Sequence, residues 1–550
     1  MSAPLALAPA DEVPVRAVLP EVRPWVWPFL KEWQREGIAR AVIRGNQHFW
    51  WPCGSGKTLG AVVYALAFPE PVLVLTRASV RLQWAGQVRR FATVEPFVLL
   101  PESAKRAASG ELDDYLKRCF IRRTRPFLIV GWPSLTEEWA ELRRLTGGGT
   151  HEEVVSGLNR GITRFLRWVG APTIVWDESH NAKDHRRWDA KAASDGSNRF
   201  VKRTTTAAIA GFLAPRARRR LALTATPQPD RRRDLWAQLD IVHPGCVGPF
   251  WSKPERGVVG FAERFCGAFE DTYGWDTKGA SNGGELRELI DPWVHHVTTA
   301  RVKEHMPPLR RETTFLAPES LRPASKEARA KLKEAKRSKD AEAIIQATLE
   351  AAATQKDKVV VEIVLDCIAS GQKVILFTEL RSHSERLRFV ILKAAGKQFP
   401  PNKVGGDGSK VSWRLWHAHG GSSPLEREGI REEYMAWQDA GVLVGTGDAW
   451  GESADLHDTD RLIHVTLPWT WGKLRQRSGR PWRLGGRPVL EQFLICAGTI
   501  EEHIAGVVMG KLRAVEEVLP DEHIGEVRDA LQGGTDDEIL TGLLDRFMED

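Results

Sequence analysis

The sequence predicts an α/β protein with two doubly wound parallel-sheet domains and a mainly helical insertion between them. Nearly continuous apolar runs such as PVLVLTR (residues 71–77) alternate with helical patterns. Such runs are typical of parallel strands that are buried on both faces. The alternation stops near residue 244 and resumes near residue 359. Because strands that alternate with helices favour a parallel sheet, two separate series predict two sheets.

The first domain is expected over residues 24–243, after a flexible tail at residues 1–23. A helical pattern from about Arg23 ends at Gly45, and glycine commonly ends helices. The strand QHFWW, the turn PCGSGKT and the helix LGAVVYALAF follow in that order. Further strands are predicted at residues 71–77, 127–132, 173–180 and 221–227.

The insertion is expected over residues 244–358, where apolar runs are few. The stretch from Ser325 to Thr354 is rich in Ala, Lys and Glu and predicts helix with a charged, solvated face. The second domain is expected over residues 359–515, and an acidic helical tail over residues 516–550. The strands of the second domain are predicted at residues 373–379, 414–420, 442–447, 461–468 and 488–498.

Length and composition agree with a large globular protein. The chain has 550 residues, and its 78 Lys and Arg against 71 Asp and Glu give a formal net charge of +7. That length is enough for three or four domains at roughly 100–200 residues each. Hydrophobic residues at 42% and charged residues at 27% exclude a disordered or fibrous protein. The basic balance permits a polyanionic partner.

Cysteines and apolar runs exclude other classes. The six cysteines are scattered and form no CxxC pair, so we expect neither zinc nor a disulfide framework. This cysteine usage favours a reducing, cytoplasmic setting. No apolar run approaches the ~18 residues that a membrane span requires, so we expect no membrane contact. The N-terminus lacks a positive charge before its apolar residues and is interpreted as a tail, not a signal peptide.

A Gly-rich turn between a strand and a helix predicts a nucleotide site. Glycines let backbone N–H groups approach a phosphate, and a helix N-terminus adds positive potential. Lys57 can reach the β- and γ-phosphates of ATP, and the Thr58 hydroxyl can bind Mg²⁺. Trp51 takes the first Gly position of the strict GxxxxGK[ST] pattern, so a chance loop is the alternative. The loop consists of Gly54, Ser55, Gly56, Lys57 and Thr58.

An acidic pair, Asp177 and Glu178, closes the apolar strand TIVW. The carboxyl ends of parallel strands form the edge where α/β folds bind ligands. Asp177 is therefore expected to hold Mg²⁺, and Glu178 to orient and deprotonate the attacking water. A surface acidic pair is the alternative interpretation.

The order of these motifs resembles helicase superfamily 2. GSGKT, DESH, LALTATP and a distant QRSGRPWR follow that superfamily's order. DLWAQLDIVHPG and GTIEEHI (residues 498–504) are similar to motifs of its Swi/Snf-type ATPases. FAERFCGAFEDTYGWDTKGASNGGELRELI resembles the annealing-helicase branch, and TARVKEHMPPLRRE resembles the family's brace. The resemblance covers roughly residues 24–512 and implies two RecA-like lobes, a Swi/Snf-type insertion and an ATPase that translocates on double-stranded DNA.

The resemblance implies a role for three further residues of the first lobe. Gln34, in LKEWQREGI, matches the glutamine that reads adenine. Thr224 and Thr226 match the motif that couples hydrolysis to DNA contact. The alternatives are an ordinary exposed helix residue for Gln34 and a simple turn for the two threonines.

The motif QRSGRPWR is similar to the family's motif that donates arginine fingers, and its matching residues are Gln476, Arg480 and Arg483. The three-residue spacing of the two arginines predicts that both guanidiniums lie on one helix face. Two fixed cations suit the charge that develops during phosphoryl transfer. Since Lys57 and Glu178 lie in the first domain, we expect ATP in a cleft that is complete only when the lobes close.

Several loops are candidates for contact with the DNA backbone, which requires no base reading. For each loop a plain structural turn is the alternative. The runs Arg218–Arg220 and Arg231–Arg233 are equally consistent with DNA contact and with solvated basic surface. The segment TGDAWGESADL is one residue longer than the matching family motif, so its DNA contact is expected to differ. The loop candidates are Arg77, Trp132, His419, Gly420, Gly445 and Thr446.

The expected function is an ATP- and Mg²⁺-dependent translocase on double-stranded or forked DNA that remodels or anneals DNA. Its expected setting is replication, recombination or repair in a bacterial or phage-infected cell, near the nucleoid. A strand-separating DNA or RNA helicase is the first alternative. A motor-like interaction subunit of a replication, recombination or defence complex is the second, and a small-molecule P-loop enzyme is the third.

Overall fold

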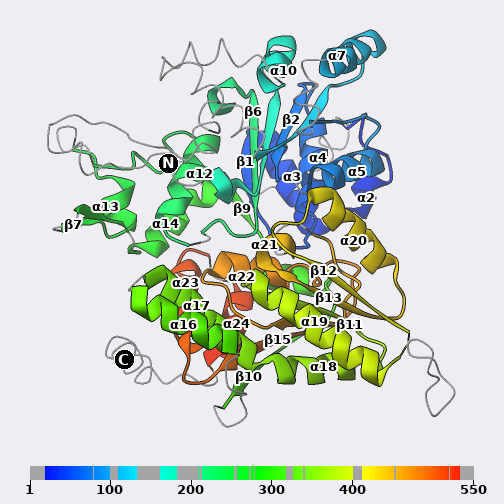
Figure 1. Cartoon of the computed structure of the whole chain (residues 1–550). Coiled ribbons are helices and arrows are strands. Elements are labelled where there is room, and N and C mark those ends of the chain that lie inside the picture. Colours follow the sequence, from blue (N-terminus) through cyan, green and yellow to red (C-terminus); the bar gives the residue numbers. More distant parts are fainter. Residues whose placement is uncertain are drawn as a thin grey trace. The chain divides into compact units, whose positions relative to one another are not determined.

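The chain divides into two units, Met1–Thr298 with Glu517–Leu519 and Thr299–Glu516 with Pro520–Asp550. Each unit contains one large parallel sheet covered by helices (Figure 1). The structure, a computed structural model, describes residues 19–77, 80–99, 110–132, 161–182, 210, 213–228, 230–252, 257–271, 274–277, 279–317, 326–338, 341–400, 412–450, 454–519 and 521–532.

Within the described residues, the sheet of the first unit has seven parallel strands in the order β3-β4-β2-β5-β6-β1-β9. Every residue of β2, β4 and β5 is buried, which confirms the prediction of strands buried on both faces. The strands are β1 (Asn46–Trp50), β2 (Val72–Thr76), β3 (Phe97–Leu99), β4 (Phe127–Gly131), β5 (Thr173–Asp177), β6 (Arg219–Thr224) and β9 (Val294–His296).

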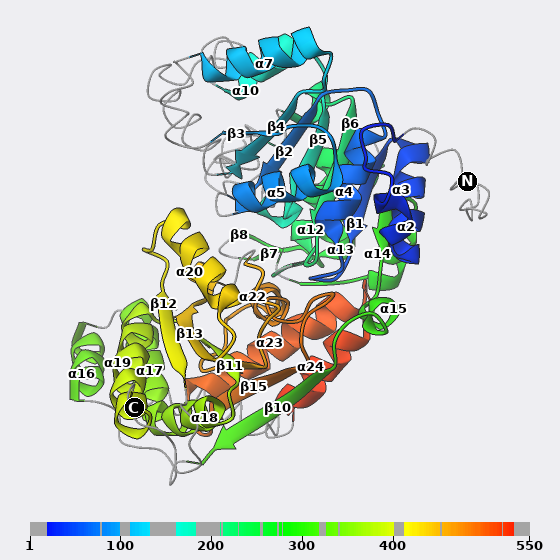
Figure 2. The ribbon, with the colours of Figure 1, turned by 90° about the vertical axis from the view of Figure 1, so that its right-hand side faces the viewer.

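Helices cover both faces of this sheet (Figure 2). α3 (Glu32–Arg44), α4 (Lys57–Leu66) and α5 (Arg81–Phe91) pack on one face. α7 (Glu111–Arg122), α10 (Ile162–Val169) and α12 (Arg233–Val242) share an apolar core with the other. The shorter elements are α2 (Val26–Phe29), η4 (Ser179–Ala182), η6 (Ala214–Arg216), α13 (Phe261–Phe265), β7 (Phe269–Asp271), β8 (Gly274–Asp276), α14 (Gly283–Ile290) and η8 (Asp291–Trp293).

The helix predicted from Arg23 to Gly45 is two helices, α2 and α3. The backbone is extended at Leu30 and Lys31, and α3 begins after them. The Lys31 N–H donates to Gln34 Oε1 at 2.8 Å, which satisfies an N–H group that has no partner within the helix. The predicted end at Gly45 is confirmed, because this glycine adopts a left-handed conformation with φ 78°.

The stretch 244–358 is only partly helical. α16 (Lys326–Ser338) and α17 (Ala341–Gln355) are helices, but β9 pairs with β1 and β10 (Leu309–Leu316) pairs with β15. The sequence did not reveal these strands, because β9 has three residues and β10, LRRETTFL, has no apolar run. α15 (Thr299–Lys303) lies between the two strands in sequence.

The second unit contains a parallel sheet in the order β10-β15-β14-β11-β13-β12. The five strands predicted for the second domain are confirmed. α18 (Asp357–Ala369) and α19 (Arg381–Gln398) pack on one face, and α20 (Pro424–Ala436) and α21 (Gly447–Trp450) on the other. The remaining elements are β11 (Lys373–Thr378), β12 (Trp413–Ala418), β13 (Ala440–Thr446), β14 (Arg461–His464), β15 (Val489–Cys496), α22 (Trp471–Ser478), α23 (Ile500–Glu516) and α24 (Glu522–Gln532).

Residues 521–532 pack into the second unit, where the sequence predicts part of an acidic tail. Ile524, Val527 and Leu531 of α24 are fully buried. Asp521 accepts hydrogen bonds from the Thr299 hydroxyl at 2.9 Å and from Arg475 at 3.2 Å. The spacing of the three apolar residues is the signal in the sequence that this part of the chain has a packed face. Residues 533–550 of the predicted tail lie outside the described residues.

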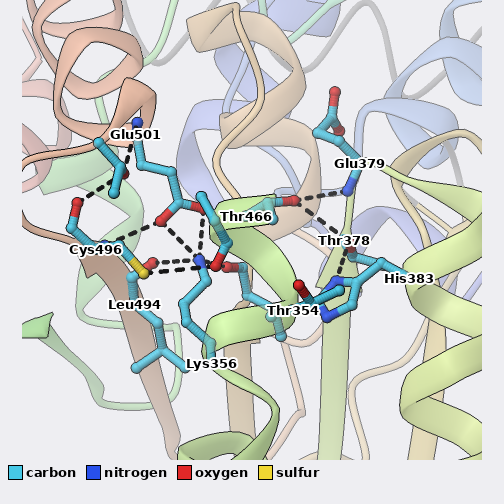
Figure 3. Close-up of polar contacts among 12 residues, drawn as sticks. Thr354, Lys356, Thr378, Glu379, His383, Thr466, Leu494, Cys496 and Glu501 are labelled. Atoms are coloured by element: carbon cyan, nitrogen blue, oxygen red, sulfur yellow. Dashed lines mark hydrogen bonds and ion pairs between the residues drawn. The ribbon is translucent and has the colours of Figure 1, made fainter. Parts of the chain in front are cut away.

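Lys356 and Glu501 form an ion pair in the core of the second unit, with side chains 0% and 1% exposed. Lys356 Nζ lies 2.6 and 2.8 Å from the two carboxylate oxygens and donates to Leu494 O at 3.1 Å (Figure 3). Glu501 also accepts the Cys496 N–H at 3.0 Å. The pair therefore ties the start of α18 to β15 and α23.

Glu501→Gln should lower the free energy of unfolding by about 3–5 kcal/mol, because Lys356 would remain buried without a counter-charge. The measurement is the urea midpoint of the full chain. The exposed pair of Arg414 and Glu433 supplies the control, since Glu433→Gln should cost below ~1 kcal/mol. Lys356→Met combined with Glu501→Leu should cost less than Glu501→Gln. A wild-type midpoint for Glu501→Gln would contradict this account.

Candidate active site

The Gly-rich loop lies between β1 and α4, as predicted. Gly54 and Gly56 have φ values of 72° and 86°, a left-handed conformation that glycine adopts without strain. A Cβ on Gly56 would lie 2.3 Å from Gln34 Nε2, so this position also needs glycine for space. α4 begins at Lys57, and its first N–H groups have no partner within the helix. The loop therefore fits an anion at a helix N-terminus.

The Lys57 ammonium lies inside this loop. Its Nζ donates to Trp51 O and to Pro52 O, both at 3.0 Å. The Ser55 hydroxyl also donates to Pro52 O, at 2.7 Å. The cation is thus held beside the N-terminus of α4, where both attract a phosphate.

Trp51, which departs from the strict loop pattern, is a core residue. Its ring stacks on Phe49 with centroids 4.3 Å apart, and its N–H donates to His295 Nδ1 at 2.8 Å. A Cβ on Gly37 or Gly60 would lie 2.6 or 2.8 Å from the indole. Gly37 in α3 and Gly60 in α4 therefore leave space for the indole beside the loop.

Gln34 is buried, which excludes the alternative of an ordinary exposed helix residue. Its Oε1 caps α3 at Lys31, and its Nε2 donates to Ser55 O at 2.9 Å. Gln34 thus connects α3 to the Gly-rich loop. Its adenine-reading role stays a prediction.

Asp177 is the last residue of β5 and Glu178 follows it, at the same sheet edge as the loop. Asp177 Oδ2 accepts hydrogen bonds from Thr76 Oγ1 at 2.7 Å and from Trp84 Nε1 at 2.8 Å. Burial, followed by the charge of Glu178, raises the pKa of Asp177 to about 6, while the hydrogen bonds from Thr76 and Trp84, and then nearby Lys57, act to lower it. A bound cation would stabilise the ionised form of a carboxylate that is buried in this way.

Glu178 belongs to a cluster that also includes His180, Thr224 at the end of β6, and Thr226 just after that strand. Glu178 has a φ of 51°, which is unusual for a residue other than glycine. Its carboxylate lies 3.3 Å from His180 Nδ1, which lies 3.1 Å from Thr224 Oγ1 and 3.4 Å from Thr226 Oγ1. The Thr226 N–H donates to Thr224 Oγ1 at 3.0 Å. Sequence reasoning missed His180, although it stands in DESH.

The DNA-contact candidates of the first unit differ in exposure. Arg77 Nη2 lies 3.5 Å from both His180 Nε2 and Asn181 Oδ1, beside the Glu178 cluster. Trp132 is buried, and its N–H donates to Asp177 O at 3.0 Å. Trp132 therefore helps to hold the end of β5, and its contact with DNA stays a prediction.

The two arginine runs make contacts within the protein. Arg232 is buried and donates to Ser281 O at 3.2 Å. Arg218 pairs with Glu70 at 2.8 Å, and the Arg219 guanidinium lies 3.9 Å from the centroid of the Phe68 ring. The two arginine runs therefore make contacts within the protein and do not form a purely solvated basic surface.

In the second unit, Gln476 lies in α22 but Arg480 and Arg483 do not. α22 ends at Ser478, so the prediction that both guanidiniums share a helix face is wrong. Gly479 caps the helix and Pro481 cannot continue it, because its ring removes an N–H and restricts the preceding residue.

The turn nevertheless brings the two guanidiniums together. Arg480 Nη1 and Arg483 Nη2 donate to Ala454 O at 3.3 and 3.2 Å. Arg480 Nε also donates to Gln476 O at 2.8 Å. The Arg483 guanidinium beside Asp455 helps to hold the pKa of that partly buried carboxyl well below its usual range.

Arg477 is a site residue that sequence reasoning missed, although it is the second letter of QRSGRPWR. It is fully buried, and burial lowers its pKa to about 9. Its guanidinium contacts the Glu379 carboxylate and donates to Thr466 O at 3.3 Å.

The second unit's DNA-contact candidates also differ in exposure. His419 and Gly420 follow β12, and His419 Nδ1 accepts the Gly421 N–H at 3.0 Å. Gly445 and Thr446 are buried at the end of β13. A Cβ on Gly445 would lie 2.2 Å from Trp450, so this glycine leaves space for the indole, and DNA contact at Gly445 and Thr446 stays a prediction.

In the part of the chain that the structure describes, no cluster of three or more His, Cys, Asp or Glu side chains has the arrangement of a metal site. None of the helices described is long and apolar enough to cross a bilayer. All six cysteines are free thiols.

The chain is similar to one helicase family model and to relatives described as SWI/SNF-related proteins and annealing helicases. Residues 355–485 match the family model described as helicase conserved C-terminal domain. The chain is 22% identical over 501 residues to the SWI/SNF-related matrix-associated actin-dependent regulator of chromatin subfamily A-like protein 1 of Xenopus tropicalis, covering 88% of this chain and 44% of the relative. It is 22% identical over 510 residues to human DNA annealing helicase and endonuclease ZRANB3, covering 89% of this chain and 40% of the relative.

The chain thus spans less than half the length of these curated relatives. Among solved structures, the Sulfolobus solfataricus SWI2/SNF2 ATPase core in complex with dsDNA matches with 18% identity and a TM-score of 0.34, over 93% of this chain and 96% of that chain.

Proposed function

We propose that this chain, which belongs to the Swi/Snf-type ATPases of helicase superfamily 2, is an ATP-dependent translocase that remodels or anneals double-stranded DNA. One observation carries the proposal: Lys57, Asp177, Glu178 and Thr226 gather at the carboxyl edge of the first sheet. At such an edge, parallel α/β sheets bind nucleotides.

Residues at this edge fit the triphosphate of ATP and a hard cation. Lys57 and the N-terminus of α4 would hold the β- and γ-phosphates. The Thr58 hydroxyl and the Asp177 carboxylate are oxygen donors of the type that Mg²⁺ prefers. Bound there, Mg²⁺ would neutralise charge on the phosphate oxygens. Glu178 would orient the attacking water and take its proton.

The second unit would supply positive charge to the reaction. Arg480 and Arg483, held at a common carbonyl, would stabilise the charge that develops on the γ-phosphate. Arg77, His419 and Gly420 are the more exposed candidates for DNA backbone contact. The remodelling or annealing activity is proposed because a relative at 22% identity is named an annealing helicase.

Two assays, one on a triplex and one on a labelled fork, separate the proposal from its alternatives. We expect ATP-dependent displacement of a third strand from a triplex, which reports movement along duplex, and annealing of complementary strands without net fork opening. Net strand separation without triplex displacement would favour the strand-separating helicase instead. Neither activity, together with ATP hydrolysis that responds only to an added protein, would favour a motor-like subunit of a replication, recombination or defence complex.

A further inference from the structure

We propose that Glu379 is a positioning residue for the arginine-bearing turn, and that the first turn of α19 links it to the candidate DNA loop after β12. The proposal deepens the proposed function and rests on it. It concerns the buried polar contacts at the carboxyl edge of the second sheet, all within the second unit.

Arg477 fixes α22 against this sheet edge. Its guanidinium contacts the Glu379 carboxylate after β11 and donates to Thr466 O after β14 at 3.3 Å. The guanidinium also lies 5.3 Å from the centroid of the Phe377 ring. A Cβ on Gly447 would lie 2.1 Å from Arg477 Nη2, so the guanidinium has little room to move. Buried charges held so closely favour one arrangement of their elements.

The position of α22 determines where the Arg480 side chain lies. Arg480 Nε donates to Gln476 O at 2.8 Å, one residue before Arg477. A shift of α22 would therefore move the guanidinium that we assign to the γ-phosphate. Since a small misplacement of a catalytic group costs much of its effect, Glu379 would act on turnover through Arg477.

Glu379 is itself oriented by a buried polar chain (Figure 3). Its N–H donates to Thr466 Oγ1 at 2.7 Å, and Thr466 Oγ1 lies 3.5 Å from Thr378 Oγ1. Thr378 Oγ1 in turn lies 3.1 Å from His383 Nδ1. His383 Nε2 lies 3.0 Å from Asp357 Oδ1, which anchors the chain in α18.

The first turn of α19 connects this chain to the candidate DNA loop. Ser384, next to His383, has its hydroxyl 3.1 Å from His417 Nε2 in β12. His419 and Gly420 follow two and three residues later. DNA bound at this loop would therefore press on the same helical turn that orients Glu379. Such a contiguous polar route is a physical basis for coupling, which mutant cycles can test.

The test measures kcat and KM for ATP in the full chain, with and without saturating duplex DNA. Glu379→Gln should lower the DNA-stimulated kcat about tenfold, with the KM for ATP close to wild type, when the assay temperature is well below the thermal midpoint of the variant. That midpoint should fall, because the buried Arg477 loses its counter-charge. Gly447→Ala, which removes no polar group, should lower kcat similarly by displacing Arg477. Glu433→Gln, at the exposed pair with Arg414, is the matched control and should behave as wild type.

A cycle between two variants tests the link to the DNA loop. Ser384→Ala should lower the factor by which DNA stimulates turnover, and adding it to Glu379→Gln should lower that factor no further. Wild-type kcat in Glu379→Gln, a rise in the KM for ATP in place of the loss in kcat, or additive losses in the cycle would overturn the positioning role. If the wild-type chain shows no DNA-stimulated hydrolysis, the proposed function fails first, and the two failures are distinguishable.

Discussion

Replacing Glu178 by glutamine should lower the kcat of ATP hydrolysis by about 10²–10⁴-fold, the range that general acid–base catalysis contributes. The affinity for ATP should stay close to wild type, because Lys57 and the N-terminus of α4 still hold the phosphates. Glutamine preserves the size of the side chain beside His180 but cannot accept a proton from water. Single-turnover hydrolysis and equilibrium ATP binding measure the two quantities separately.

Two further variants serve as comparisons for Glu178→Gln. Glu95→Gln removes an exposed carboxylate that pairs with Arg89 at 2.6 Å, and it should leave turnover unchanged. Lys57→Ala should lose ATP affinity as well as turnover, since it removes the cation inside the loop. Unchanged turnover in Glu178→Gln would remove Glu178 from its catalytic role.

Replacing Arg480 by alanine should lower kcat by about 10³-fold or more, as loss of an arginine finger does, with a much smaller change in ATP affinity. Arg480 is buried and donates to Gln476 O and Ala454 O, so alanine also removes local contacts. Arg480→Lys keeps the charge and fills more of the space, and it should still lose most of the activity because an ammonium lacks the planar fork. The measurement is steady-state hydrolysis with duplex DNA.

Arg414→Ala is the matched control for the arginine variants. Arg414 lies in β12 of the second unit, the unit that also contains Arg480. Its side chain is half exposed and pairs with Glu433 at 2.7 Å. It should leave kcat and KM unchanged. If Arg480→Ala raised KM and left kcat intact, Arg480 would be a ground-state contact and not a finger.

The sequence was sufficient for the two sheets because their central strands are buried on both faces. β2, β4 and β5 are uniformly buried and mostly apolar, most residues of β11 and β13 are apolar, and helical patterns separate these strands. The Gly-rich loop and the acidic pair were predictable for a related reason. Their chemistry requires particular residue types directly after such strands.

Other features depend on contacts between residues far apart in the chain. The sequence cannot reveal that Trp51 fills the space left by Gly37 and Gly60, or that Trp132 faces inward. The roles of Arg477 and Glu379 are hidden for the same reason, because 98 residues separate them. The end of α22 was predictable from Gly479 and Pro481, but the spacing of the arginines suggested a longer helix.

The central claim is tested most directly by ATP hydrolysis of the purified chain at one salt concentration. The rates are compared without nucleic acid and with single-stranded DNA, blunt duplex, forked duplex and RNA. We predict strong stimulation by blunt or forked duplex and little by single strands or RNA. Stimulation by single strands or RNA alone, or the same rate in all five reactions, would contradict a double-stranded DNA translocase.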